Sequence, residues 1–222
     1  MASRGHEPCY GLREARELLN YVLKSYFLFQ YPWMVSFGEH FNQTGTSVWM
    51  HYCGGALVSE NVVVTAAHCF FYEKKNCGNC GFNRLTQIRT GDQNFTDTTD
   101  NDLVIGTYEI SSILKHPGYA GRGPKNDLAI VFTKTPIDFN AWTNPIALPS
   151  INDPIRDLYT NYSADFTGYG YFDDTLIASS ALREAHFTIF TGSYCEAQFA
   201  YPPIQDHLVN TSILICAGTD VS

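Results

Sequence analysis

The chain has 222 residues, enough for one large β domain or two small ones with a buried core. Hydrophobic residues make up 45% and charged residues 16%, a composition typical of globular and not of disordered proteins. The 14 Lys and Arg against 22 Asp and Glu give a net charge of −8, which argues against nucleic acid and membrane surfaces as partners, and no apolar run is long enough to span a bilayer.

The N-terminal segment is predicted to contain a helix over residues 12–27, because apolar side chains recur there at three- and four-residue intervals with charged residues between them. After Pro32 the pattern changes to short apolar runs bounded by turn residues, with breaks at Gly54-Gly55, Gly91-Asp92, Pro117-Gly118 and Pro149. This pattern favours an antiparallel β sandwich or barrel. Strands are predicted over 33–37, 47–53, 56–58, 62–65, 86–90, 103–114, 128–133, 164–169 and 183–190, and a short helix over 193–200.

Seven cysteines and several Asn-x-Ser/Thr sequons favour an oxidising, secretory compartment. The first thirty residues contain neither the apolar region nor the small-residue cleavage site of a signal peptide. We therefore expect a secreted protein whose N-terminus is either incomplete or wrongly started in this sequence. The sequons begin at Asn42, Asn94, Asn161 and Asn210.

Two segments contain residue patterns that also occur in metal-binding sites. In both segments an interpretation without a metal is favoured. Cys77 and Cys80 form a Cys-x-x-Cys without a second ligand pair, so a small loop disulfide is favoured over zinc or redox chemistry. An acidic loop offers hard oxygen ligands that suit calcium, but a solvated acidic turn is favoured. No cofactor or metal is expected. The acidic residues are Asp92, Asp97, Asp100 and Asp102.

Two short motifs carry residues suited to catalysis. Residues 65–69 read Thr-Ala-Ala-His-Cys and supply His68, and residues 126–129 read Asn-Asp-Leu-Ala and supply Asp127. A histidine acts as a general base when a carboxylate holds its tautomer and stabilises the imidazolium. Asp127 enters an apolar strand, where a buried charge is costly unless it is paired. His68 is therefore a physically sensible partner for Asp127.

Further landmarks stand in a fixed order along most of the chain. They are Pro-Trp-Met-Val-Ser at 32–36, Cys-Gly-Gly-Ala-Leu-Val at 53–58, Val-Val-Thr-Ala-Ala-His-Cys at 63–69, His-Pro-Gly-Tyr at 116–119, Asn-Asp-Leu-Ala at 126–129, Asn-Pro-Ile-Ala-Leu-Pro at 144–149, Thr-Gly-Tyr-Gly at 167–170 and Ile-Cys-Ala-Gly at 215–218. With these landmarks the chain resembles the trypsin/chymotrypsin-like serine endopeptidases over about residues 30–218.

The resemblance implies an all-β fold of two antiparallel Greek-key barrels. The first barrel would occupy about residues 30–145, and an incomplete second barrel about residues 146–222. Residues 1–29 would form an N-terminal extension that carries the short helix. The resemblance also implies a protein or peptide as substrate.

By the same resemblance, His68 is the general base and Asp127 is its orienting carboxylate. Two disulfides are implied as well, one beside the histidine and one in the second barrel. The implied pairs are Cys53 with Cys69 and Cys195 with Cys216.

The sequence also departs from the family pattern. No Gly-Asp-Ser-Gly-Gly box follows Cys216, and Ser222 lacks the flanking glycines of an oxyanion hole. Residues 20–23 read Asn-Tyr-Val-Leu, without a preceding Arg or Lys, where the family has its activation site. Cys9 has no evident partner, because Ala147 stands where some relatives carry a cysteine.

Two functions are compatible with these observations. The favoured one is a secreted serine endopeptidase whose sequence is cut short before its nucleophile. The alternative is a non-catalytic protease homologue that acts as a binding module. In either case we predict that the 222 residues alone are inactive, because His68 has no nucleophile to deprotonate.

Overall fold

The computed structural model describes residues 24–25, 30–43, 46–70, 85–96, 105–121, 125–150, 159–171, 177–199 and 215–219. The regular secondary structure of these residues is mostly strand, with two short helices. The strands are β1 (Lys24–Ser25), β2 (Met34–Gln43), β3 (Thr46–Ser59), β4 (Val62–Thr65), β5 (Gln87–Thr90), β6 (Gly106–Lys115), β7 (Ala129–Thr133), β8 (Ser163–Gly168), β9 (Arg183–Phe190) and β10 (Cys216–Gly218); the helices are the 3-10 helix η1 (Ala67–Phe70) and α3 (Gly192–Phe199).

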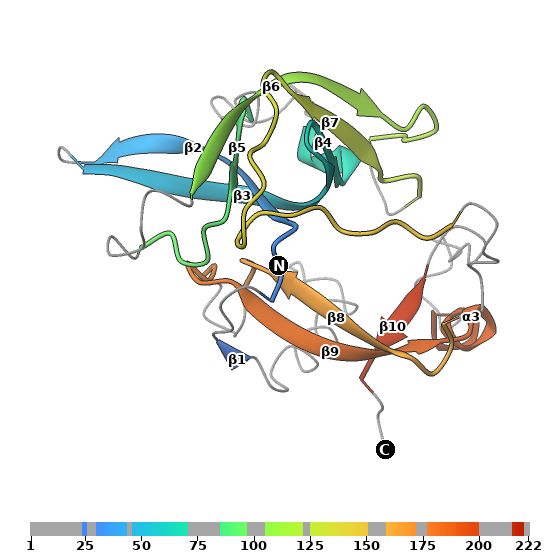
Figure 1. Cartoon of the computed structure of the whole chain (residues 1–222). Helices are drawn as coiled ribbons and strands as arrows, with labels where there is room; N and C mark the ends of the chain where they lie inside the picture. The colour runs from blue at the N-terminus through green and yellow to red at the C-terminus, as the bar shows by residue number, and fades with distance from the viewer. Residues whose placement is uncertain are drawn as a thin grey trace, which may run out of the picture.

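Six strands close into an antiparallel barrel in the order β2-β3-β4-β7-β6-β5 (Figure 1). The short strands alternate buried and half-buried residues, as the two-residue side-chain period of a strand requires. Closure leaves these six strands without a free sheet edge, since β5 pairs with β2. The barrel core consists of Val35, Phe37, Leu57, Val63, Cys69, Leu85, Ile88, Val131 and Ile137.

A second sheet lies below the barrel in the view of Figure 1 and has β9 at its centre. Strand β8 pairs with one edge of β9, and β1 and β10 pair with the other edge at its two ends. Unlike the barrel, this sheet is open within the described residues. The mostly β architecture confirms the predicted all-β fold class.

The barrel and the second sheet are joined by a short segment that follows β5. Asn94 forms a β-bridge with Ala181, and the Leu182 amide donates to the Gln93 carbonyl at 2.7 Å. The buried Tyr169 hydroxyl donates to the backbone carbonyl of Asp92. These contacts fix the second sheet against the barrel wall.

Most of the predicted strands are present, but the predicted break at the glycine pair is wrong. Strand β3 continues through it, with Gly54 opposite Ser36 and Gly55 opposite Val35. A β-carbon on Gly55 would lie 2.7 Å from the Phe37 ring. Gly55 therefore marks a close approach to the core, and the pair does not form a turn.

The N-terminal helix predicted over 12–27 falls mainly outside the described residues. Its last part is wrong, because Lys24 and Ser25 form β1 and pair with Glu184 and Arg183 of β9. Sheet hydrogen bonds override the helical spacing of the side chains there. The helix predicted over 193–200 is confirmed as α3, shifted by one residue.

The expectation of a solvated acidic loop is wrong for Asp92. Its carboxylate is buried and lies 2.9 Å from Nε of Arg89, and it also accepts the Asn94 amide at 2.9 Å. The ion pair compensates the cost of burying the charge, so Asp92 is part of the packing. Cys9, Cys77, Cys80, Asp97, Asp100, Asp102 and Ser222 lie outside the described residues.

In the described part of the chain, no helix has the length and apolar character needed to cross a lipid bilayer.

Candidate active site

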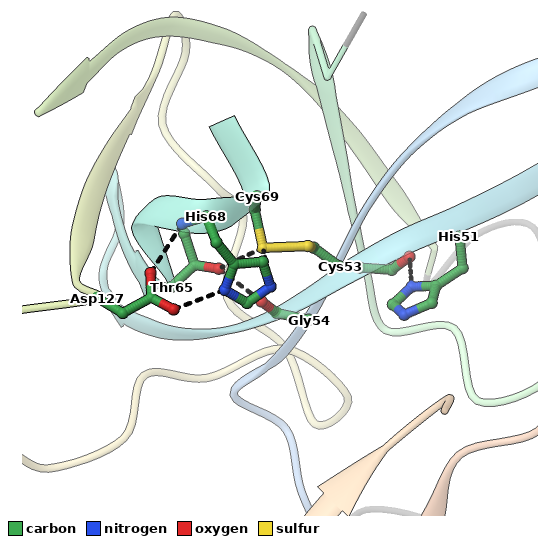
Figure 2. The surroundings of a disulfide bond; sticks show 8 residues. His51, Cys53, Gly54, Thr65, His68, Cys69 and Asp127 are labelled. Atoms are coloured by element: carbon green, nitrogen blue, oxygen red, sulfur yellow. Dashed lines mark hydrogen bonds and ion pairs between the residues drawn. A yellow bond between two sulfur atoms is a disulfide. The ribbon is translucent and has the colours of Figure 1, made fainter. Parts of the chain in front are cut away.

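His68 lies in η1, where the chain turns directly after β4. The Thr65 hydroxyl donates to the Gly54 carbonyl at 2.7 Å and fixes the end of β4 on β3. Ala67 is completely buried, and Cys69 is bonded to Cys53 of β3. The short helix is therefore anchored on both sides of the histidine (Figure 2).

Asp127 lies immediately before β7, and the barrel brings it to His68. Strands β4 and β7 are neighbours, and their ladder ends with Thr65 opposite Ala129. His68 and Asp127 stand just beyond this last pair, on the same side of the sheet end. The sequence predicted the two residues, and the β4–β7 pairing brings them together.

The carboxylate of Asp127 binds His68 through both oxygens. Oδ1 accepts the backbone amide of His68 at 2.7 Å, and Oδ2 lies 2.7 Å from the ring Nδ1 (Figure 2). A carboxylate only accepts hydrogen bonds, so Nδ1 carries the proton and Nε2 keeps its lone pair. The His68 side chain is 61% exposed, whereas that of Asp127 is 19% exposed. This arrangement is an exposed imidazole with a fixed orientation, held by a largely buried carboxylate.

The loop beside Asp127 contributes a further residue that the sequence analysis did not single out. Asn126 has a φ of 59°, in the left-handed region that asparagine tolerates better than most residues. Its Nδ2 donates to the Gly118 carbonyl at 3.1 Å. The pKa of the nearby Tyr119 is raised, mainly by burial and to a smaller extent by the negative charge of Asp127. The positive φ of Asn126 and its hydrogen bond to Gly118 therefore set the direction in which the chain enters β7.

Replacing Asn126 tests this role. We expect Asn126→Ala to lower the free energy of unfolding by about 1–2 kcal/mol, because alanine is strained at positive φ. Asn126→Gly is expected to cost less, since glycine adopts this backbone freely. Denaturant unfolding measures both, and the low-field Nδ1 proton of His68 in the NMR spectrum reports the contact with Asp127. Equal stability of the two variants would contradict the assignment.

A second histidine–aspartate pair lies on the second sheet, but it differs from the first. His186 of β9 and Asp165 of β8 are register partners, with Nδ1 and Oδ1 2.6 Å apart. The other ring nitrogen lies 4.0 Å from Oε1 of the buried Glu184. His186 thus stands between two carboxylates, whereas among the described residues the contacts of His68 include only one carboxylate.

His51 of β3 forms a network that the sequence did not reveal. Its Nδ1 lies 2.7 Å from the Ser36 hydroxyl, which also accepts the indole N–H of Trp49 at 2.8 Å. The ring stacks on Phe95 and contacts Tyr169. Burial lowers the pKa of His51 to about 4. The partners come from three different segments, so no local motif could have predicted them.

Within the described residues, one group combines three metal-ligating side chains, namely Cys53, His68 and Cys69. The two sulfur atoms are bonded to each other and so offer no thiolate. The described residues also contain the Cys195–Cys216 disulfide, which links α3 to β10. Both are the pairs that the family resemblance implies.

A closed six-stranded barrel, a second sheet and a histidine–aspartate pair at the end of the barrel define a protein of the chymotrypsin-like class. The family model described as Trypsin matches residues 26–221, most of the chain, which therefore belongs to the trypsin family of serine proteases.

Known relatives share modest identity with the chain. Trypsin-1 of Salmo salar is 27% identical over 168 residues, covering 76% of this chain and 58% of that protein. The venom peptide isomerase heavy chain of Agelenopsis aperta is 28% identical over 198 residues, covering 86% of this chain and 72% of that protein. The solved structure of neuropsin, a serine protease expressed in the limbic system of mouse brain, has a TM-score of 0.63 at 19% identity and covers 89% of this chain and 74% of neuropsin. The chain thus spans less than two thirds of Trypsin-1.

Proposed function

We propose that this chain supplies the general base and its orienting acid to a secreted serine endopeptidase. The observation that carries the proposal is the two-point contact of Asp127 with the amide and the Nδ1 of His68. This contact fixes the ring and its tautomer and leaves Nε2, which lies 3.8 Å from the disulfide-bonded Sγ of Cys69, as the nitrogen that would accept a proton from a nucleophile. A buried structural histidine would not need a side chain that is 61% exposed.

The proposed roles follow from the geometry. His68 takes the proton of a serine hydroxyl during attack on a peptide carbonyl, and Asp127 stabilises the imidazolium that forms. The 222 residues contain no Gly-Asp-Ser-Gly-Gly box, so the proposal assigns the serine to sequence outside them. Protein or peptide substrates and secretion belong to the same proposal. Secretion is supported by the two disulfides.

The function is tested on the native protein with a fluorophosphonate, which labels an activated serine. We expect a labelled species that contains peptides of this chain and is larger than 24.9 kDa. Native protein that contains these peptides but stays unlabelled would favour the alternative, a non-catalytic homologue that binds partners. Recombinant residues 1–222 alone are expected to cleave no peptide.

A variant series assigns the activity to the barrel pair. In the active protein, His68→Ala is expected to lower kcat by at least about 10²–10⁴-fold, the usual contribution of a general base. His186→Ala is the matched control, since His186 also has an aspartate 2.6 Å from Nδ1 but lies on the second sheet. Similar losses in both variants would overturn the assignment of His68.

A further inference from the structure

Two of the sequons lie in described parts of the chain with their side chains defined, and their surroundings differ. In the sequon that begins at Asn161, all three residues are exposed. In the sequon that begins at Asn94, the asparagine and Phe95 are half-buried. A glycan is bulky and hydrophilic, so the folded protein tolerates it only where the asparagine faces solvent.

Asn161 occupies the third position of a tight turn before β8. The Tyr162 amide donates to the Tyr159 carbonyl at 2.9 Å, and φ of Asn161 is 68°. This turn geometry favours glycine or asparagine. The backbone amide of Asn161 donates to Ile189 of β9 at 2.8 Å, and none of the described residues hydrogen-bonds its carboxamide. The backbone is fixed while the carboxamide remains available.

Both the side chain and the backbone of Asn94 make contacts within the structure. Its Oδ1 accepts the amide of Thr96 at 3.2 Å and the hydroxyl of Thr96 at 2.8 Å. Its backbone forms the bridge to Ala181 that joins the barrel to the second sheet, and Phe95 stacks on His51. A glycan on Nδ2 of Asn94 would leave the Oδ1 hydrogen bonds in place, but it would have to fit beside a half-buried residue at the bridge and beside the Phe95–His51 stack.

We propose that Asn161 carries an N-linked glycan. This inference rests on the secretory location in the proposed function. In the transfer, Nδ2 of Asn161 forms a bond to C1 of a lipid-pyrophosphate-linked oligosaccharide, the C1–O bond breaks, the pyrophosphate leaves with the electron pair, and Nδ2 loses one proton. The sugar stands beside Tyr162, which is 63% exposed, and beside β8, which is an edge strand within the described part of the sheet. It shields an apolar side chain and an edge that could otherwise pair with another chain.

The test is translation of the 222-residue chain behind a cleavable secretory leader in the presence of microsomes, followed by peptide-N-glycosidase digestion in heavy-oxygen water and peptide mapping. We expect position 161 to be recovered as labelled aspartate. Ser163→Ala is expected to abolish the label at this position, and Ser163→Thr and Asn94→Gln to retain it. The conservative Ser163→Thr variant shows that loss in Ser163→Ala is not a folding defect.

Unmodified Asn161 in chain that has entered the microsomes would overturn the inference, as would a label at this position that survives Ser163→Ala. Because the leader delivers the chain to the lumen, the result does not depend on peptidase activity. Failure of fluorophosphonate labelling leaves this result unchanged, so the two proposals fail separately.

Discussion

Acidification from pH 7 to pH 4 is expected to lower the free energy of unfolding by about 3 kcal/mol through His51 alone. Burial lowers the pKa of this histidine in the folded protein to about 4, from 6.5 in the unfolded chain. The unfolded state therefore binds more protons below pH 6.5. The stabilisation is fully present above pH 6.5 and is lost as the pH falls toward 4.

Denaturant unfolding at several pH values measures this effect, and His51→Gln is the control. Glutamine can still accept a hydrogen bond from Ser36 but does not titrate. The variant removes only the contribution of His51 to the pH dependence, while carboxylates and other histidines contribute equally in both proteins. Identical pH slopes for the two proteins would show that His51 is not buried in its neutral form.

The second large effect is expected at Gly55. A β-carbon there would lie 2.7 Å from the Phe37 ring and 2.9 Å from the Val64 carbonyl, closer than real contacts allow. Gly55→Ala is therefore expected to lower the free energy of unfolding by about 1–3 kcal/mol or more, since neither the barrel core nor the backbone can give way cheaply. The displacement would also move Cys53 and, through the disulfide, η1 with His68.

Gly54→Ala is a matched control in the adjacent position of the same strand. A β-carbon on Gly54 would have no atom within 4 Å, so we expect a change within about 0.5–1 kcal/mol, of either sign. Thermal or denaturant unfolding of both variants measures the two changes in the free energy of unfolding. A cost for Gly55→Ala as small as that for Gly54→Ala would contradict the packing described around Phe37.

Residues 62–65 and 183–190 show how far local pattern predicts this fold. Both predicted strands coincide with β4 and β9, because short β-branched or alternating runs bounded by turn residues have few other solutions. At 54–55 the same reasoning failed. Glycine marks both turns and close approaches, and only the packing of Phe37 against β3 separates the two.

For the site, the family resemblance implied that Asp127 orients His68, but the local residues could not show the β4–β7 pairing that brings the two together. Asp92 shows the same limit. Its acidic surroundings favoured a solvated turn, and the half-buried Arg89 was identified as its partner only from the structure. Ser36 and His51 lie on different strands, and no sequence motif indicated that they would be in contact.

The barrel order has a kinetic consequence for the chemistry. His68 and Asp127 are separated by 59 residues, and they meet only when β7 has paired with β4. That pairing closes a long loop. Loop closure costs conformational entropy, and the contacts of the paired strands must compensate this cost before His68 and Asp127 can meet. A nascent or partly folded chain therefore holds no oriented base. In the proposed peptidase, the oriented His68 would therefore form only as β7 completes the barrel.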